Sequence, residues 1–305
     1  MAETLKDTLS FFKKIFGIIR APFLILTPAC VILGLAAAVH SSGRISTFDF
    51  LLALVGALCA HISVNTLNEY FDFKSGLDSR THRTPFSGGS GTLQQNPSFA
   101  AAALIIAFIA IILIVVIGLY FSLLRGPAII PLGIMGLILV VFYTLRITRY
   151  PVLCLIAPGL GFGIFMVMGT NFALTGKYTW SSFIASLVPF FLVNNLLLLN
   201  QYPDTDADKT VGRRHLPIVI GRTKSSYIYA LFLLSAYLSI IAGIYLKYFP
   251  ISGLLGLITI PPAILATIGV FRDAENIEKL NTYLALNVII IIATPLLLSA
   301  GLMLN

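Results

Sequence analysis

The chain has 305 residues, of which 58% are hydrophobic and only 10% are charged, and its mean hydropathy is +0.95. Soluble globular domains are much more polar than this, so the composition excludes that class and indicates an integral membrane protein. The net charge of +8 is explained by the basic loops described below and does not require a nucleic-acid partner.

Apolar segments follow one another along the whole chain. A membrane-spanning helix needs about 20 apolar residues, and irregular backbone does not face lipid. We therefore predict an all-α, polytopic membrane protein, a single domain over residues 1–305 with nine transmembrane helices around a central cavity. The predicted spans are residues 17–40, 48–71, 98–121, 126–145, 151–174, 180–202, 226–246, 251–271 and 281–303. Before them, the amphipathic residues 1–16 predict an interfacial segment with no cleavable signal.

The basic residues give the orientation. With nine spans, four of the 20 Lys and Arg residues lie on one side of the membrane, which leaves the other 16 on the side of the N-terminus. Loops rich in Lys and Arg stay in the cytoplasm. We expect the N-terminus on the cytoplasmic side of the cell membrane and the C-terminus outside. The four residues on the outer side are Arg44, Arg125, Lys177 and Lys247.

Acidic residues are concentrated in two short stretches. One stretch follows the second predicted span and the other follows the sixth, so both lie on the cytoplasmic side. Together they hold half of the 12 acids. This placement suggests two related halves of the protein that face each other. The six residues are Glu69, Asp72, Asp78, Asp204, Asp206 and Asp208.

Helical spacing arranges these acids into two polar stripes. Residues three or four positions apart share one face of a helix. The stripes consist of His61, Asn65, Asn68 and Asp72 on the second span and of Asn200, Asp204 and Asp208 on the sixth. Pro203 either starts a new helical turn or breaks the sixth span. Pairing with nearby Lys and Arg would balance the charge. It does not explain carboxylates at i and i+4, which repel each other, or asparagines inside a span.

Two facing carboxylate clusters suit Mg²⁺, which binds through one or two carboxylates and completes its shell with water and phosphate oxygens. Such clusters can hold a diphosphate from both sides, while Lys and Arg bind the remaining oxygens. A membrane cavity behind them would hold an apolar tail, so the expected substrate is an isoprenyl diphosphate. A transporter is the competing hypothesis. Because the acids lie at one membrane face and not near the midplane, the enzyme is favoured.

Two motifs carry a family resemblance. The stretch NTLNEYFDFKSGLD (residues 65–78) and the pattern D-x-x-x-D-x-x-x-G (residues 204–212) resemble the two aspartate motifs of the UbiA superfamily of intramembrane prenyltransferases. The first motif is similar to that of the branch that prenylates 1,4-dihydroxy-2-naphthoate. The resemblance implies a Mg²⁺-dependent prenyltransferase of quinone or menaquinone biosynthesis with an apolar aromatic acceptor. The metal ligands that it implies are Asn68, Asp72, Asp78, Asp204 and Asp208.

The chain departs from the common motifs at three positions. Glu69 replaces the first Asp of N-D-x-x-D-x-x-x-D, Gly76 stands where the last Asp is expected, and Pro203 stands where the naphthoate branch usually has Arg. These differences leave the acceptor more open than the donor. A glycerol-phosphate lipid, 4-hydroxybenzoate and haem are the alternative acceptors.

The expected mechanism is ionisation of the allylic C1–O bond, followed by attack of an electron-rich ring on the allyl cation. Asp72 and Asp208 would act as catalytic residues through the metal. Tyr143 either faces the cation or anchors its span at the interface. The Gly- and Ser-rich loop of residues 80–93 is predicted to be a lid. The expected substrate-binding residues are Asn65, Asn68, Lys74, Arg80, Arg83, Arg146, Arg149, Asn200 and Lys209.

Further polar residues lie in or beside the spans. We expect His61 to be a hydrogen-bonded buried histidine, and Asn194 and Asn195 to line the cavity or to bond between helices. Arg20 either extends its charged head to the interface or reaches an acidic group of the acceptor.

Overall fold

The fold is all-helical, as predicted, in the computed structural model of the protein, which describes residues 2–43, 45–81 and 83–304, with side chains from residue 8 onward. Within the described residues, eight helices are long and apolar enough to cross a membrane, whereas the fourth predicted span (residues 126–145) corresponds to the shorter apolar segment Pro127–Phe142. Arg44, which entered the orientation count, and His82 of the predicted lid lie outside the described residues.

The helical elements follow the predicted spans closely, and several spans are built from consecutive segments. The α-helices are α1 (Ala2–Ile18), α2 (Leu26–Ser42), α3 (Thr47–Ser75), α4 (Thr92–Gln95), α5 (Ala100–Arg125), α6 (Ile130–Phe142), α7 (Pro151–Gly159), α8 (Gly169–Thr175), α9 (Trp180–Thr210), α10 (Leu216–Ile220), α11 (Arg222–Tyr245), α12 (Ile260–Asp273) and α13 (Ile277–Met303). The remaining helical segments are the π-helix η6 (Leu160–Met168) and the 3-10 helices η1 (Ala21–Ile25), η2 (Leu77–Ser79), η3 (Pro97–Phe99), η4 (Pro127–Ile129), η5 (Ile147–Arg149) and η7 (Ile251–Thr259).

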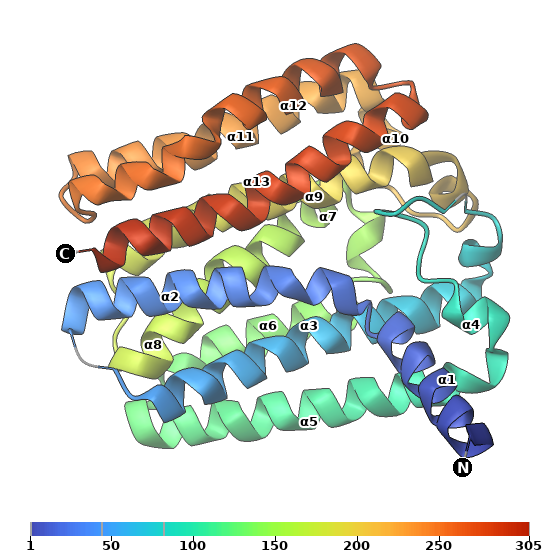
Figure 1. Ribbon diagram of the computed structural model, residues 1–305, viewed down its shortest axis with the longest axis horizontal. Coiled ribbons are helices and arrows are strands. Elements are labelled where there is room, and N and C mark those ends of the chain that lie inside the picture. The colour runs from blue at the N-terminus through green and yellow to red at the C-terminus, as the bar shows by residue number, and fades with distance from the viewer. Residues whose placement is uncertain (1, 44, 82, 305) are drawn as a thin grey trace.

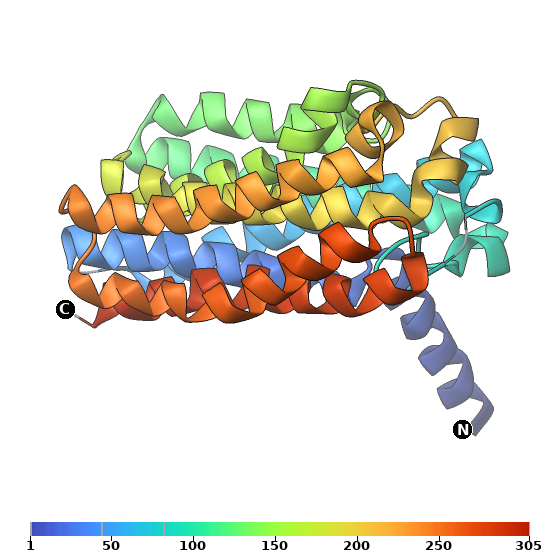
Figure 2. The same cartoon turned by 90° about the horizontal axis from the view of Figure 1, so that it is seen from above.

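The long helices lie side by side, with α5 at one edge of the bundle, α11 and α12 at the other, and α2, α9 and α13 between them (Figure 1). α1 leaves the bundle at an angle (Figure 2). Its Phe11, Phe12 and Phe16 are exposed, as an interfacial helix requires. The interfacial role of this segment stays a prediction.

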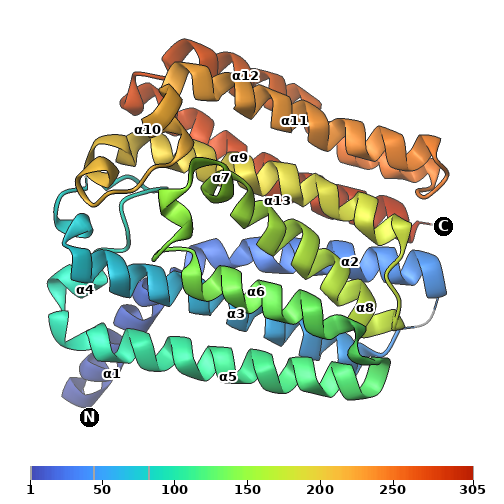
Figure 3. The same ribbon diagram turned by 180° about the vertical axis from the view of Figure 1, so that it is seen from behind.

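Both acidic stretches lie at the same end of the bundle. The loop after α3 and the segment around α10 meet at one end, and the C-terminus lies at the opposite end (Figures 1 and 3). The predicted meeting of the two motifs on one side is therefore confirmed. The assignment of that side to the cytoplasm remains a prediction from the basic residues.

The sixth span is longer than predicted. Residues 180–202 were expected, but α9 continues through Pro203 to Thr210. Proline lacks the N–H that would bond the carbonyl of Leu199, four residues earlier. The next carbonyls before Pro203 receive additional donors. The Thr205 hydroxyl donates to the Gln201 carbonyl (2.9 Å), and Arg222 Nε donates to the Tyr202 carbonyl (2.9 Å). The second acidic stripe therefore sits on regular helix.

The fifth span contains a wide helical segment. α7, η6 and α8 form one span, and η6 is a nine-residue π-helix. π-helices are rare and are frequently found at functional sites. A Cβ at Gly159 would lie 2.2 Å from the Phe190 carbonyl oxygen, and one at Gly163 would lie 2.4 Å from the Phe190 nitrogen. The absent side chains thus let this span pack directly on the backbone of α9.

Candidate active site

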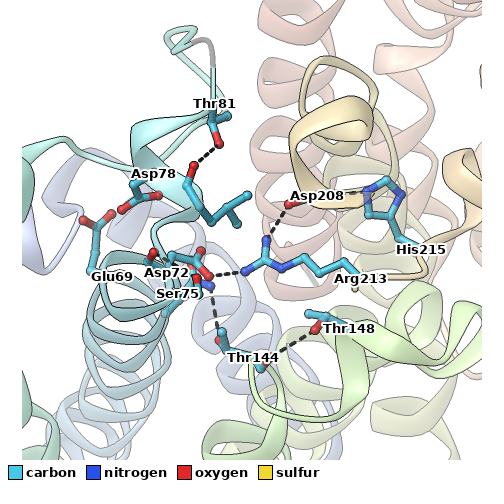
Figure 4. A network of polar contacts seen from close by, with 12 residues as sticks. Glu69, Asp72, Ser75, Asp78, Thr81, Thr144, Thr148, Asp208, Arg213 and His215 are labelled. Carbon is cyan, nitrogen blue, oxygen red and sulfur yellow. Dashed lines mark hydrogen bonds and ion pairs between the residues drawn. The ribbon is translucent and has the colours of Figure 1, made fainter. Parts of the chain in front are cut away.

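The two acidic stripes converge on one arginine. Nη2 of Arg213 donates to Oδ1 of Asp72 on α3, and Nη1 donates to Oδ1 of Asp208 on α9 at 3.0 Å. On its other side, Asp208 Oδ2 lies 2.9 Å from Nε2 of the buried His215. Figure 4 shows the guanidinium between the two carboxylates. Both aspartates are buried, and buried charges are strongly unfavourable without such partners.

The position of Arg213 follows from the turn that ends α9. Gly212 takes a φ of +78°, a conformation that glycine adopts readily, and the Arg213 amide donates to the Asp208 carbonyl at 3.2 Å. Burial by itself would lower the pKa of Arg213, but the charges of Asp72 and Asp208 raise it, so the guanidinium stays protonated. From the sequence, Arg213 was considered only as a charge partner of the acids and His215 was given no role, so neither was predicted as a site residue. The available signal was that the run GRRH (residues 212–215) directly follows the second motif.

Glu69 ties the loop after α3 to the N-terminal region. Its Oε1 accepts from Arg20 Nε (2.5 Å) and from the Ser90 amide (2.8 Å), and its Oε2 accepts from the Ser90 hydroxyl (2.9 Å). Arg20 therefore lies in a partly buried ion pair with Glu69, with 23% of its side chain exposed. Neither of the two roles expected of Arg20 included this partner, and a contact with the acceptor stays a prediction. The three donors occupy the carboxylate that replaces the usual first Asp of the motif.

Asp78 lies beside Asp72 because α3 ends at Gly76, which takes a φ of +70° and turns the chain back. Gln94 Nε2 donates to Asp78 Oδ2 at 2.5 Å. The loop passes so close that a Cβ at Gly89 would lie 2.8 Å from Asp78 Oδ1. Burial, together with the nearby charges of Asp72 and Glu69, raises the pKa of Asp78 to about 6.

These groups surround a polar pocket with a volume of about 120 Å³. Four acids and two arginines line it, so its lining carries more negative than positive charge. The buried oxygens Asn200 Oδ1 and Asp204 Oδ1 have no hydrogen-bond partner in the part of the chain that is described. The charged and amide residues in the lining are Arg20, Asn68, Asp72, Asp78, Asn200, Gln201, Asp204, Asp208 and Arg213.

The pocket adjoins a much larger apolar cavity of about 590 Å³, which extends between the helices. Its volume lies within the range of about 300–1,000 Å³ that is usual for ligand sites. The two spaces share lining residues, so they adjoin and give the site a charged end and an apolar end. The shared residues are Arg20, Asn68, Phe86, Tyr143, Leu197 and Asn200.

The asparagines that were predicted to bind substrate lie at different positions in the site. Asn68 Nδ2 donates to the Thr144 hydroxyl at 3.1 Å, which fixes α3 against the segment that carries Tyr143. Asn65 lines the apolar cavity and donates to the Ile19 carbonyl at 3.0 Å. Asn200 lies at the junction of the two spaces.

Six predicted basic residues are exposed, and none of the six is among the residues that line the pocket. Lys74 lies 5.8 Å from the centre of the Tyr70 ring, and Lys209 Nζ lies 3.6 Å from Asp206 Oδ1. Their part in substrate binding stays a prediction, whereas the basic side chains inside the pocket are Arg20 and Arg213. The six are Lys74, Arg80, Arg83, Arg146, Arg149 and Lys209.

The Gly- and Ser-rich loop covers the pocket. Phe86, Ser87, Gly88 and Gly89 line it, and the contacts of Ser90 and Gln94 hold the loop down at Glu69 and Asp78. The expected position of the lid is thus present, and its movement stays a prediction.

Interhelical hydrogen bonds hold the helices around the cavity. His61 Nδ1 lies 2.8 Å from the Thr27 hydroxyl, so the expected buried, hydrogen-bonded histidine is confirmed. Asn194 Oδ1 accepts from the Gly159 amide (2.6 Å), and Asn195 Nδ2 donates to the Tyr229 carbonyl (2.8 Å). Both asparagines bond between helices, one of the two roles expected of them.

The donor set fits a hard divalent cation. The pocket offers carboxylate and amide oxygens, an excess of negative charge and two buried oxygens without partners. Within the described residues, no three His, Cys, Asp or Glu side chains are clustered closely enough to enclose a metal. Mg²⁺ does not require such a cage, because it commonly binds through one or two carboxylates together with water and phosphate oxygens.

Known proteins resemble the chain in sequence and in fold. It is 27% identical over 181 residues to the 1,4-dihydroxy-2-naphthoate octaprenyltransferase of Bacillus subtilis (strain 168), an alignment that covers 58% of this chain and 57% of that protein. It is 28% identical over 192 residues to the digeranylgeranylglyceryl phosphate synthase of Pyrococcus horikoshii, covering 61% of this chain and 64% of that protein. The chain thus spans less than two thirds of the length of either relative.

A UbiA homologue from Archaeoglobus fulgidus, solved with DMAPP and Mg²⁺, has the same fold, with a TM-score of 0.61 and 14% identity over 96% of this chain and 100% of that one. Residues 26–290, most of the chain, match the UbiA prenyltransferase family. The chain therefore belongs to the UbiA prenyltransferase family.

Proposed function

We propose that the protein transfers a prenyl group, in a Mg²⁺-dependent reaction, from an isoprenyl diphosphate to an aromatic acceptor within the membrane. One observation carries the proposal: a polar pocket lined by both acidic stripes adjoins an apolar cavity, with which it shares Asn68, Tyr143 and Asn200. An amphiphile with a charged head and a long apolar tail matches this combination.

The metal would be held by Asn68, Asp72 and Asp78 on one side of the pocket and by Asp204 and Asp208 on the other. When bound, it would supply Lewis-acid and electrostatic stabilisation of the negative charge that develops on the departing diphosphate. The Archaeoglobus structure, which holds DMAPP and Mg²⁺, supports this assignment by analogy of fold.

The chain's own residues would bind the diphosphate and protect the cation. Arg213 lies between the two stripes and can donate paired N–H bonds to phosphate oxygens, and Arg20 adds a second positive charge. Tyr143 lies at the junction of the two spaces, where its ring can stabilise the allyl cation. The apolar walls of the cavity exclude water, which would otherwise capture that cation.

The proposed acceptor is a naphthoate or a similar quinone precursor. The first motif and the Bacillus relative support this choice. The Pyrococcus relative supports a glycerol-phosphate lipid as the alternative. We place the reaction at the cytoplasmic face of the cell membrane, because the pocket lies at the end of the bundle that carries most of the basic residues.

The test is transfer by the purified protein. It would be incubated with Mg²⁺ and labelled geranylgeranyl diphosphate, together with 1,4-dihydroxy-2-naphthoate, a glycerol-phosphate lipid, 4-hydroxybenzoate or haem. We expect a prenylated naphthoate that is absent when Asp72→Asn replaces the wild type. The matched control is Asp206→Asn in the same motif, whose side chain is 81% exposed. Transfer to none of the four acceptors would contradict the proposal. Transfer to the lipid alone would show that the acceptor is a glycerol-phosphate lipid and not a naphthoate.

A further inference from the structure

The apolar cavity extends far beyond the place where the bond to the diphosphate would break. Its lining includes Asn68 near the polar pocket and also Ala53, Phe121 and Ile129 towards the opposite end of the bundle. At about 1.5 Å per residue along α3, Ala53 lies roughly 28 Å from Asp72. A short prenyl group would fill only the part of the cavity nearest Tyr143.

Two glycines form part of the far wall. Gly118 on α5 and Gly133 on α6 both line the cavity, and at each of them a Cβ would meet no described heavy atom within 4 Å. Elsewhere glycine is required by packing: at Gly163 a Cβ would lie 2.4 Å from the backbone of α9. Close packing therefore does not account for Gly118 or Gly133. Glycine also disfavours a helix relative to alanine, so the open space itself gives a reason for both residues.

The same region reaches the outer surface of the bundle. Val115, Leu119 and Ile134 line the cavity, yet they are 49%, 58% and 52% exposed. They stand next to the two glycines on α5 and α6. In a membrane this surface faces lipid, so a long chain that passes the glycines can continue into the bilayer.

We propose that Gly118 and Gly133 contact the distal part of the donor's prenyl chain and that they set a preference for long-chain donors. The inference rests on the proposed function and adds the residues that select the length of the donor. The proposed occupant is the isoprenoid tail. A lipid acyl chain is the competing occupant.

The test fills the space one residue at a time. In Gly118→Leu and Gly133→Leu, we would measure kcat/KM with dimethylallyl, geranyl and geranylgeranyl diphosphate and one acceptor. Filling an apolar pocket discriminates by on the order of tenfold or more. We expect the ratio of geranylgeranyl to dimethylallyl kcat/KM to fall by that factor, while transfer from dimethylallyl diphosphate stays close to the wild-type value.

Matched controls add bulk to the same helices outside the cavity. Ile112 on α5 and Met135 on α6 are 60% and 53% exposed and are not among the lining residues. Ile112→Phe and Met135→Phe should keep the wild-type ratio. If a leucine variant does not fold, Gly118→Ala and Gly133→Ala should still shift the ratio in the same direction.

An unchanged ratio in folded variants would overturn the inference and point to a lipid chain as the occupant. An equal loss with all donors would overturn it as well, because the glycines would then serve packing. Both results leave the proposed function intact, since the wild type transfers. Failure of the proposed function is a different result, in which the wild type transfers neither the short nor the long group.

Discussion

Asp72 and Asp208, which belong to different halves of the chain, share the guanidinium of Arg213. One positive charge thus lies between two buried carboxylates. Because Asp78 and Asp204 line the same pocket, the acids outnumber the bases even with Arg213 in place. The arrangement attracts further positive charge, which a divalent cation would supply.

Asp72→Asn and Asp208→Asn should each abolish most prenyl transfer. Asn keeps the size of the side chain but removes the charge, and the loss of a charge-stabilising group typically costs on the order of a hundredfold or more in kcat. The double variant should lose far less than the product of the two single losses, because the residues act as one unit. The measurement is single-turnover transfer at saturating Mg²⁺, with Asp206→Asn as the control. Transfer that persists in the double variant, or in excess chelator, would refute the metal-dependent mechanism.

Arg213→Gln should destabilise the metal-free protein. Removing one member of a buried ion pair typically costs about 3–5 kcal/mol, and here two buried carboxylates would be left facing each other. Mg²⁺ would then restore part of the lost stability, so the rise in Tm on adding Mg²⁺ should be larger than in the wild type. Thermal unfolding in detergent with and without Mg²⁺ measures both effects.

The neighbouring Arg214 provides the control for this experiment, because its side chain is exposed. Arg214→Gln should unfold like the wild type under both conditions. Equal Tm shifts on adding Mg²⁺ in the wild type and in Arg213→Gln would show that the metal does not bind between these two aspartates.

Hydropathy and helical spacing predicted the membrane spans and the two polar stripes, because both depend on local periodicity. The stripe Asn200, Asp204 and Asp208 was correctly placed on one helix although α9 was predicted to end eight residues too early. Pro203 is the reason, since a proline in the sequence does not by itself tell whether a helix ends there or continues through it.

The partners of the acids were not predictable in the same way. Arg213 reaches Asp72 only because the turn at Gly212 directs it back across the bundle, and Glu69 meets Arg20 and Ser90 from distant parts of the chain. Such contacts depend on how the helices pack. The local sequence does not distinguish Arg213, which lines the pocket, from Arg80, Arg146 and the other exposed basic residues near the motifs.

Glu69→Gln should loosen the loop over the pocket. The change removes the charge that attracts Arg20 and replaces one of the acceptor oxygens with a donor, so the bonds to Ser90 weaken. Loss of a charged hydrogen-bonded contact typically costs about 1.5–3 kcal/mol. We expect several-fold faster trypsin cleavage at Arg80 and Arg83, followed by mass spectrometry. Glu275→Gln is the control, because Glu275 is 65% exposed. Equal cleavage rates in the two variants would contradict the proposed role of Glu69 in holding the loop.

The protonation of Asp78 should make metal binding depend on pH. Its folded-state pKa is raised to about 6 by burial and the neighbouring acids, above the unfolded value of about 3.9. The contribution of Asp78 to the free energy of unfolding is therefore fully present below the pKa of the unfolded state. It is lost as pH rises through about 6. Mg²⁺ needs the ionised form, so its affinity should fall as pH drops below about 6.

Asp78→Asn tests this directly. Above pH 7 the metal-free variant should unfold at a higher temperature than the wild type, because no charge has to be buried. Its Mg²⁺ affinity should be weaker and less dependent on pH between 5 and 7, as measured by calorimetric titration. A wild-type affinity that stays constant across this range would show that Asp78 is not a ligand.

The orientation of the bundle can be measured with single cysteines. The native cysteines Cys30, Cys59 and Cys154 are buried, so a variant that carries alanine at all three gives a background without labelling. Thr210 ends α9 at the pocket end, and Lys177 lies in the turn between α8 and α9 at the opposite end. Because basic loops stay in the cytoplasm, Thr210→Cys in intact cells should resist an impermeant maleimide and react only after the membrane is opened, whereas Lys177→Cys should react in both states. The reverse pattern would place the pocket outside the cell, where the proposed cytoplasmic reaction has no site, and reaction of both positions from one side would contradict the arrangement of α9 as a spanning helix.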